Sequence, residues 1–162
     1  MIGGGDAGFN ALDSIERATI NADGTLGSFT VLPGARLRRP NAYATSVTIG
    51  DWFYVIGGGT QKTSYTSVER AAIGVDGSLG QFEDVVGATL PVAARHLQAV
   101  VLGTWLYVLG GEDAVIERAA IDPDGSLGPF AAVPGFGLDP GANAAGAVVV
   151  DDMLYILGGL AS

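Results

Sequence analysis

The chain has 162 residues, with 26 glycines and no cysteine, so disulfides and thiolate chemistry are excluded. Apolar residues make up 48% of the chain and charged residues 15%, a balance that excludes disorder. The net charge of −9 argues against nucleic acid and anionic membranes as partners. We find no transmembrane segment and no signal peptide, and therefore expect a soluble protein, in a compartment that the sequence leaves unknown.

One segment, which begins with Glu-Arg and ends with Leu-Gly-x-Phe, occurs three times, at 16–29, 69–82 and 117–130. Each copy is followed by an apolar segment that ends in Gly-Gly, at 52–58, 105–111 and 153–159. The step from the glutamate to the second glycine is constant (16 to 58, 69 to 111, 117 to 159). The chain is therefore built from repeats of ~40–50 residues, with all variation in length between Gly-Gly and Glu-Arg.

Each repeat predicts four short strands, which we call a, b, c and d in chain order. Strand a is a β-branched apolar run such as 99–102, and a tight turn such as Gly50-Asp51 joins it to strand b, at 52–56 in the first full copy. Strand c carries Glu-Arg, an Asp-Gly turn follows, and Leu-Gly-x-Phe opens strand d. Four antiparallel strands in each repeat predict an all-β fold.

The repeat resembles the kelch repeat, through Tyr54-Val-Ile-Gly-Gly58, Ser67-Val-Glu-Arg70, Phe82 and Arg95-His96. It departs from kelch in having phenylalanine where the outer-strand tryptophan stands, and Ala42 and Asn143 at the opening arginine. The resemblance implies a β-propeller of four-stranded antiparallel blades. We therefore expect residues 1–162 to form a single propeller unit, with repeats at about 2–55, 56–108 and 109–156 and a terminal a-b half-blade that ends at 159.

The strand order predicts two whole blades and one blade divided between the two ends of the chain. Strands c and d come first, two complete sets follow, and strands a and b come last. Three blades are too few to close a ring, which typically has 4–8. We expect two chains to form a homodimer of six blades, in which the a-b half of one chain completes the c-d half of the other. The alternative is a fragment of a longer propeller.

Candidate ligand-binding residues lie in the connections from strand d to strand a, beside the b-c loops of variable length. Arginines there could bind a carboxylate, a sulfate or an acidic sugar, and the aromatic residues could stack on a ring. The alternative for the arginines is pairing with the abundant carboxylates, and for the lone histidine a structural role. The candidates are Arg36, Arg38, Arg39, Tyr43, Arg95, His96 and Asn143.

The repeated Glu-Arg and Gly-Gly positions favour a structural role. Neighbours on a strand point to opposite faces, so each glutamate and its arginine cannot act on one substrate together. Recurrence in every repeat suggests hydrogen bonding to a neighbouring turn instead. These positions are Glu16, Glu69, Glu117, Arg17, Arg70, Arg118, Gly57, Gly58, Gly110, Gly111, Gly158 and Gly159.

We expect no catalytic residue, metal or cofactor, and the copper-oxidase branch of kelch-type propellers is excluded by the absence of cysteine and the single histidine. The favoured function is a non-enzymatic module for binding or scaffolding that assembles with itself, and that binds a carbohydrate, an acidic small ligand or a protein. One alternative is a sugar- or acidic-ligand-active enzyme that uses Arg, Tyr and His at the channel mouth. The other is an engineered or excised repeat fragment without a function beyond self-assembly.

Overall fold

The computed structural model describes residues 2–111, 115–138 and 145–159, in which all regular structure is β-strand. None of these residues forms a helix that could cross a membrane. The strands are β1 (Glu16–Arg17), β2 (Thr30–Val31), β3 (Thr45–Ile49), β4 (Trp52–Ile56), β5 (Val68–Ala72), β6 (Glu83–Asp84), β7 (Leu97–Leu102), β8 (Trp105–Gly110), β9 (Val115–Ala120), β10 (Ala131–Ala132), β11 (Gly146–Val150) and β12 (Met153–Leu157).

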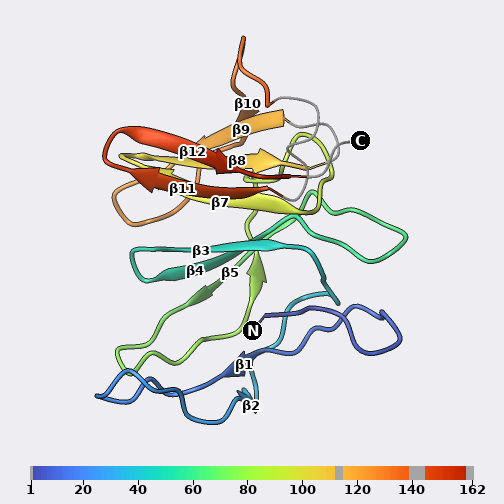
Figure 1. Ribbon diagram of the computed structural model, residues 1–162, viewed down its shortest axis with the longest axis vertical. Coiled ribbons are helices and arrows are strands. Elements are labelled where there is room, and N and C mark those ends of the chain that lie inside the picture. The colour runs from blue at the N-terminus through green and yellow to red at the C-terminus, as the bar shows by residue number, and fades with distance from the viewer. Residues whose placement is uncertain (1, 112–114, 139–144, 160–162) are drawn as a thin grey trace.

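Two complete sheets and two half-sheets follow one another along the chain (Figure 1). The complete sheets are four-stranded antiparallel meanders, β3-β4-β5-β6 and β7-β8-β9-β10. The half-sheets are the antiparallel pairs β1-β2 and β11-β12. The all-β class and the four-stranded antiparallel sheets are thus as the sequence predicts. The half-sheets correspond to strands c and d at one end of the chain and strands a and b at the other.

The two complete sheets share one register, which makes positions in different repeats comparable. Tyr54 lies opposite Arg70, and Tyr107 lies opposite Arg118 at the corresponding place. Trp52 and Trp105 lie opposite Ala72 and Ala120 in the same way. A position in a half-sheet can therefore be assigned its counterpart in a complete sheet.

Strand d begins later than the sequence predicts, after the Leu-Gly-x-Phe segment and not at its start. Leu79 forms an isolated bridge with Ile73 instead, and Leu26 and Leu127 make the same bridge in the other repeats. These bridges belong to the turn between strands c and d, where the amide of Gly77 donates to the carbonyl of Gly74 over 2.8 Å. The apolar pair closes a wide turn, which leaves two residues for strand d.

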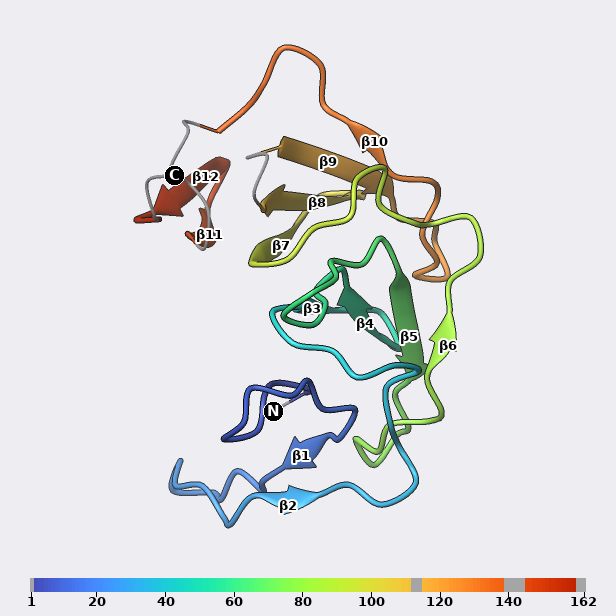
Figure 2. The ribbon, with the colours of Figure 1, turned by 90° about the vertical axis from the view of Figure 1, so that its right-hand side faces the viewer.

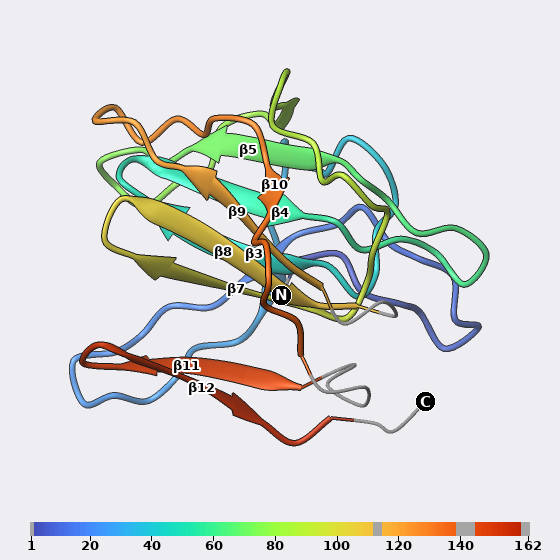
Figure 3. The ribbon, with the colours of Figure 1, turned by 90° about the horizontal axis from the view of Figure 1, so that it is seen from above.

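The sheets are arranged as an open arc with a half-sheet at each end (Figure 2). β7 contacts β3 on one side and β11 on the other, so the first strands of successive units lie together on the inner side. The a-b hairpin turns lie at one end of the molecule, and the connection from β4 to β5 lies at the opposite end (Figure 3). The long connections and the short turns are therefore on opposite faces, as the meander requires.

Two apolar clusters hold the arc together. One lies between the two complete sheets and includes Tyr54, Ile56, Leu106 and Phe130. The second joins β1-β2 to the first complete sheet and includes Ile15, Leu32, Leu37, Val55 and Phe82. No described residue of β11-β12 belongs to either cluster.

Candidate functional site

The three arginines of the first d-a connection are paired with carboxylates. Arg36 Nη1 lies 2.7 Å from Asp13 Oδ1, and Arg38 Nε lies 3.7 Å from Asp84 Oδ2. Arg39 bridges two acids, at 2.6 Å from Asp84 Oδ1 and 3.2 Å from Glu69 Oε1. These pairs join the connection to the loop before β1 and to strands β5 and β6, which is the structural alternative that the sequence left open. A ligand acid would have to compete with these contacts.

Tyr43 and His96 occupy the same repeat position and contact each other. Their ring centroids are 4.6 Å apart, and the amide of His96 donates to the carbonyl of Tyr43 over 2.9 Å. Both have left-handed backbones, with φ of 60° and 58°, a conformation that costs about 1–3 kcal/mol in a residue with a side chain. The repeat thus places an unusual turn just before β3 and just before β7.

Arg95 lies on the same face and donates from Nη1 to the carbonyl of Thr60 over 3.1 Å. It therefore ties the d-a connection of the second unit to the b-c loop of the first. Asn143, the remaining candidate ligand residue, lies outside the described residues.

The repeated glutamates are buried acceptors of backbone hydrogen bonds. Glu69 is 1% exposed, and its Oε2 accepts from the amide of Arg38 over 2.8 Å. Glu117 is likewise buried and accepts a backbone hydrogen bond from Val92, at the corresponding place in the next d-a connection. Burial raises the pKa of both carboxyls, because the charged form loses its hydration. Glu16, in the half-sheet, is less deeply buried.

The repeated arginines lie over tryptophan rings in the complete sheets. The Arg70 guanidinium carbon is 3.9 Å from the Trp52 ring centroid, and that of Arg118 is 4.1 Å from the Trp105 centroid. Such cation–π contacts stabilise by about 0.5–2 kcal/mol. Arg17, at the same position in β1, instead lines a cavity.

The Gly-Gly pairs that end strand b adopt backbones that only glycine adopts readily. All six glycines have positive φ, and those of Gly57 and Gly58 are 60° and 83°. A Cβ on Gly57 would stand 2.7 Å from the carbonyl oxygen of Ala94, in the d-a connection of the second unit. The pair thus allows one unit to approach the next closely. The other four are Gly110, Gly111, Gly158 and Gly159.

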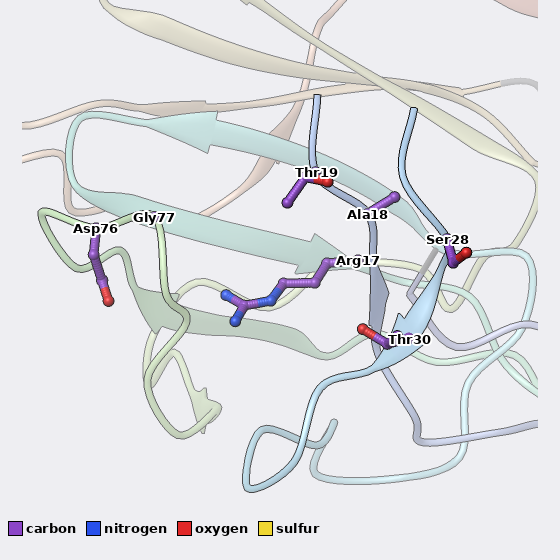
Figure 4. A pocket seen from close by; sticks show the side chains of 7 residues that line it. All are labelled: Arg17, Ala18, Thr19, Ser28, Thr30, Asp76 and Gly77. Atoms are coloured by element: carbon purple, nitrogen blue, oxygen red, sulfur yellow. The ribbon is translucent and has the colours of Figure 1, made fainter. Parts of the chain in front are cut away.

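The cavity beside β1 has a volume of about 590 Å³ (Figure 4). Arg17 lines it from β1, Thr19 from the residues that follow β1, and Thr30 from β2. Asp76 and Gly77 line it from the c-d turn of the first complete sheet. The guanidinium of Arg17 extends toward that turn in Figure 4. The cavity therefore lies along the side of β1 that faces the neighbouring unit.

Several residues that are buried in the first complete sheet have exposed counterparts in the half-sheets. Tyr155 is 49% exposed, whereas its counterpart Tyr54 is fully buried. Leu157 is 58% exposed against 0% for Ile56, and Phe29 is 56% exposed against 4% for Phe82. The residue types are the same or similar, so the difference comes from the strands that lie beside them. Both half-sheets thus expose apolar residues of the kind that the complete sheets bury.

No known family model and no curated protein matches this chain. Its chemistry must therefore be judged from its own residues. No group of three or more metal-ligating side chains occurs among the described residues. The most evident feature of the described residues is a pair of exposed strand edges with apolar side chains. A cavity lies along one of these edges.

The sequence offered no indication of one buried polar residue, Asn41. Its Nδ2 donates to the carbonyl of Gly57 over 2.9 Å, and its Oδ1 accepts from the amide of Gly59 over 2.7 Å. Asn41 is only 2% exposed, and its counterpart in the next repeat is Ala94, so no repeat pattern could reveal it. Its side chain satisfies two backbone groups of the Gly-Gly turn.

Proposed function

We propose that this chain is a non-enzymatic, kelch-type β-propeller module that assembles with a second copy of itself. In this assembly the β11-β12 half of each copy completes the β1-β2 half of the other. Two complete sheets per chain and two joined sheets give a ring of six blades. The product is a binding or scaffolding unit that becomes complete only as a homodimer.

The observation that carries the proposal is the unequal burial of equivalent residues. The exposed side chains of β12 include Met153 and Tyr155, and those of the β1-β2 half include Ile20, Leu26 and Phe29. The first complete sheet buries or partly buries the apolar groups at the corresponding positions, so joining the halves covers both sets at once. Removal of apolar surface from water stabilises by roughly 25 cal/mol per Å².

The number of units favours two copies. Rings of this architecture typically hold 4–8 blades, and one copy supplies the strands of three. A head-to-tail contact that uses two different surfaces closes on itself when the rotation per copy divides a full turn. A six-bladed ring made of two copies has a two-fold axis and pairs the free edge of β12 with that of β1, which protects both edges against aggregation.

The binding part of the proposal rests on the face that carries the long connections. A cavity of about 200 Å³ lies there between two b-c loops, lined by Phe9, Asn10, Thr60, Gln61 and Lys62. These side chains offer an aromatic face, amides and one cation, a set that suits a sugar or a small acid. Loops of variable length on a constant frame are where binding specificity usually lies.

The assembly is tested by particle mass, measured by light scattering behind a sizing column. We expect two chains per particle for the parent protein and one for Leu154→Lys, because the lysine would place an unpaired charge inside the joined sheet. The control is Val86→Lys, on a residue of the β6–β7 connection that is 96% exposed, and it should keep the parent mass. A parent protein that remains a single chain at micromolar concentration would refute the proposal.

A further inference from the structure

The cavity beside β1 is bounded by the counterparts of the groups that surround Tyr54 in the first complete sheet. Tyr54 lies opposite Arg70, and its hydroxyl donates to the carbonyl of Gly125, in the c-d turn of the next unit, over 2.8 Å. Arg17 corresponds to Arg70 in the repeat, and Gly77 corresponds to Gly125. Both line the cavity. The cavity therefore has the same lining at these two positions as the site that holds the strand-b tyrosine in the first complete sheet.

We propose, on the basis of the assembly above, that Met153–Ile156 of a second copy pair antiparallel with Glu16–Thr19 of the first. The register of the complete sheets then places Met153 opposite Thr19, Tyr155 opposite Arg17 and Ile156 opposite Glu16. The Tyr155 ring occupies the cavity, and its hydroxyl donates to the carbonyl of Gly77. The tyrosine thus sets the register between the two copies, and both junctions of the dimer use it.

The incoming strand is limited to these four residues because the chain already supplies the end of strand b. Ile2 forms a bridge with Ile15, and the amide of Gly3 donates to the carbonyl of Ser14 over 2.9 Å. The amide of Gly4 donates to the carbonyl of Asn41 over 2.8 Å. Ile56, Gly57 and Gly58 make the corresponding contacts in the first complete sheet, with Val68, Ser67 and Ala94.

Ile2 and an incoming Leu157 would therefore compete for the position opposite Ile15. Gly3 is buried, whereas Leu157 to Gly159 are all exposed in the structure. Displacing Ile2 would break backbone hydrogen bonds that already exist, and leaving Leu157 outside breaks none of them. The joined strand b is thus composite, with Met153–Ile156 from one copy and Ile2–Gly4 from the other.

The junction also differs from a complete sheet at one position, which offers a sharp test. Arg70 and Arg118 lie over the rings of Trp52 and Trp105, and the third counterpart of those tryptophans is Met153. In this register Arg17 of one copy therefore covers a thioether of the other. Met153→Trp restores the ring, and we expect the dimer dissociation constant to fall by about 5-fold or more over the two junctions.

The register is tested by disulfide cross-linking in a chain that has no cysteine of its own. Thr19→Cys combined with Met153→Cys places two thiols directly opposite each other across the junction, within the Cα separation that a disulfide spans. Mild oxidation should then give a covalent species of two chains on a non-reducing gel. The control combines Ala18→Cys with Met153→Cys, whose side chains point to opposite faces, and should give no such species.

Tyr155→Phe tests the hydroxyl. The loss of one hydrogen bond at each of two junctions should raise the dimer dissociation constant by about 5- to 100-fold. The matched control is Tyr65→Phe, which removes a hydroxyl bonded to the carbonyl of Pro40, away from the junction, and should leave the constant unchanged.

Failure of this register and failure of the assembly give different results. A non-covalent dimer that cross-links equally through Ala18→Cys, or not at all through Thr19→Cys, would overturn the register and leave the dimer standing. A dimer unaffected by Tyr155→Phe would overturn the role of the tyrosine. A protein with the mass of a single chain would refute both proposals.

Discussion

At the scale of single residues, the buried carboxyls Glu69 and Glu117 have the clearest energetic consequences. Each accepts a backbone hydrogen bond from the d-a connection that leads into its own sheet, so it holds that connection against strand c. Each also has a raised pKa, and the first cause is loss of hydration on burial. The repeat thus keeps a hydrogen-bond-accepting carboxyl at a buried position, where burial disfavours its charged form.

A raised pKa in the folded state means that protonation favours folding. The contribution of Glu117 is fully present below its unfolded pKa of about 4.3 and is lost as the pH rises through its raised folded pKa. We therefore expect the free energy of unfolding to fall more steeply with rising pH in the parent protein than in Glu117→Gln. Urea unfolding at several pH values from 4.5 to 7, at one protein concentration, measures both slopes.

Parallel slopes for the parent and Glu117→Gln would contradict this account of the buried carboxyl.

Several aspartates act in the opposite direction at lower pH, because hydrogen bonds lower the pKa of Asp23, Asp76 and Asp124. Their contributions are present above the ordinary aspartate pKa and are lost below it. They are common to both proteins and cancel in the comparison.

The ion pairs and the contacts of Asn41 are the features of single residues that the sequence does not predict. The arginines were correctly located in a d-a connection, but Arg36 and Asp13 are 23 residues apart, and only the packing of the half-sheet brings them together. Arg39 and Asp84 are 45 residues apart. The repeat pattern predicts what recurs, and these contacts occur once.

At the scale of elements, the strand and turn pattern carries most of the fold. The Gly50-Asp51 turn joins β3 and β4 as expected, and Glu-Arg lies on β5 and β9 as it should. The predicted start of strand d is too early, because an apolar residue within a wide turn has the same pattern as one that begins a strand. Leu79, which bridges Ile73 inside the turn, is the example.

Glycines at the ends of strand b should be far less replaceable than glycines at open turns. Gly57→Ala would place a Cβ 2.7 Å from the carbonyl oxygen of Ala94, in a residue with φ of 60°. We expect a loss of about 3 kcal/mol or more in the free energy of unfolding, measured with urea. Gly87→Ala is the control, with φ of 87° but open space around it, and should cost about 1 kcal/mol.

Equal losses for Gly57→Ala and Gly87→Ala would mean that backbone conformation alone accounts for the Gly-Gly pairs. A larger loss at Gly57 would show that the pairs exist to let successive units approach. That distinction matters for the assembly, because Gly3 and Gly4 repeat the same contacts at the edge where a second copy would join.

At the scale of the whole molecule, each unit of the arc packs only against the units next to it along the chain. The clusters bind β1-β2 to the first complete sheet and that sheet to the second, and no described residue of β11-β12 adds to them. The sequence predicted the division of strands between the ends, because the repeat order alone specifies it. It could not predict the cavity, which depends on how the half-sheet packs against the turn at Gly77.

The central claim is that two copies close into one ring. Sedimentation equilibrium over a wide range of protein concentration tests it most directly, because it distinguishes a closed dimer from an open chain of copies. The account predicts one dominant species at twice the 16.4 kDa of a single chain, without larger assemblies as the concentration rises. A persistent single-chain species, or a mass that grows continuously with concentration, would contradict it.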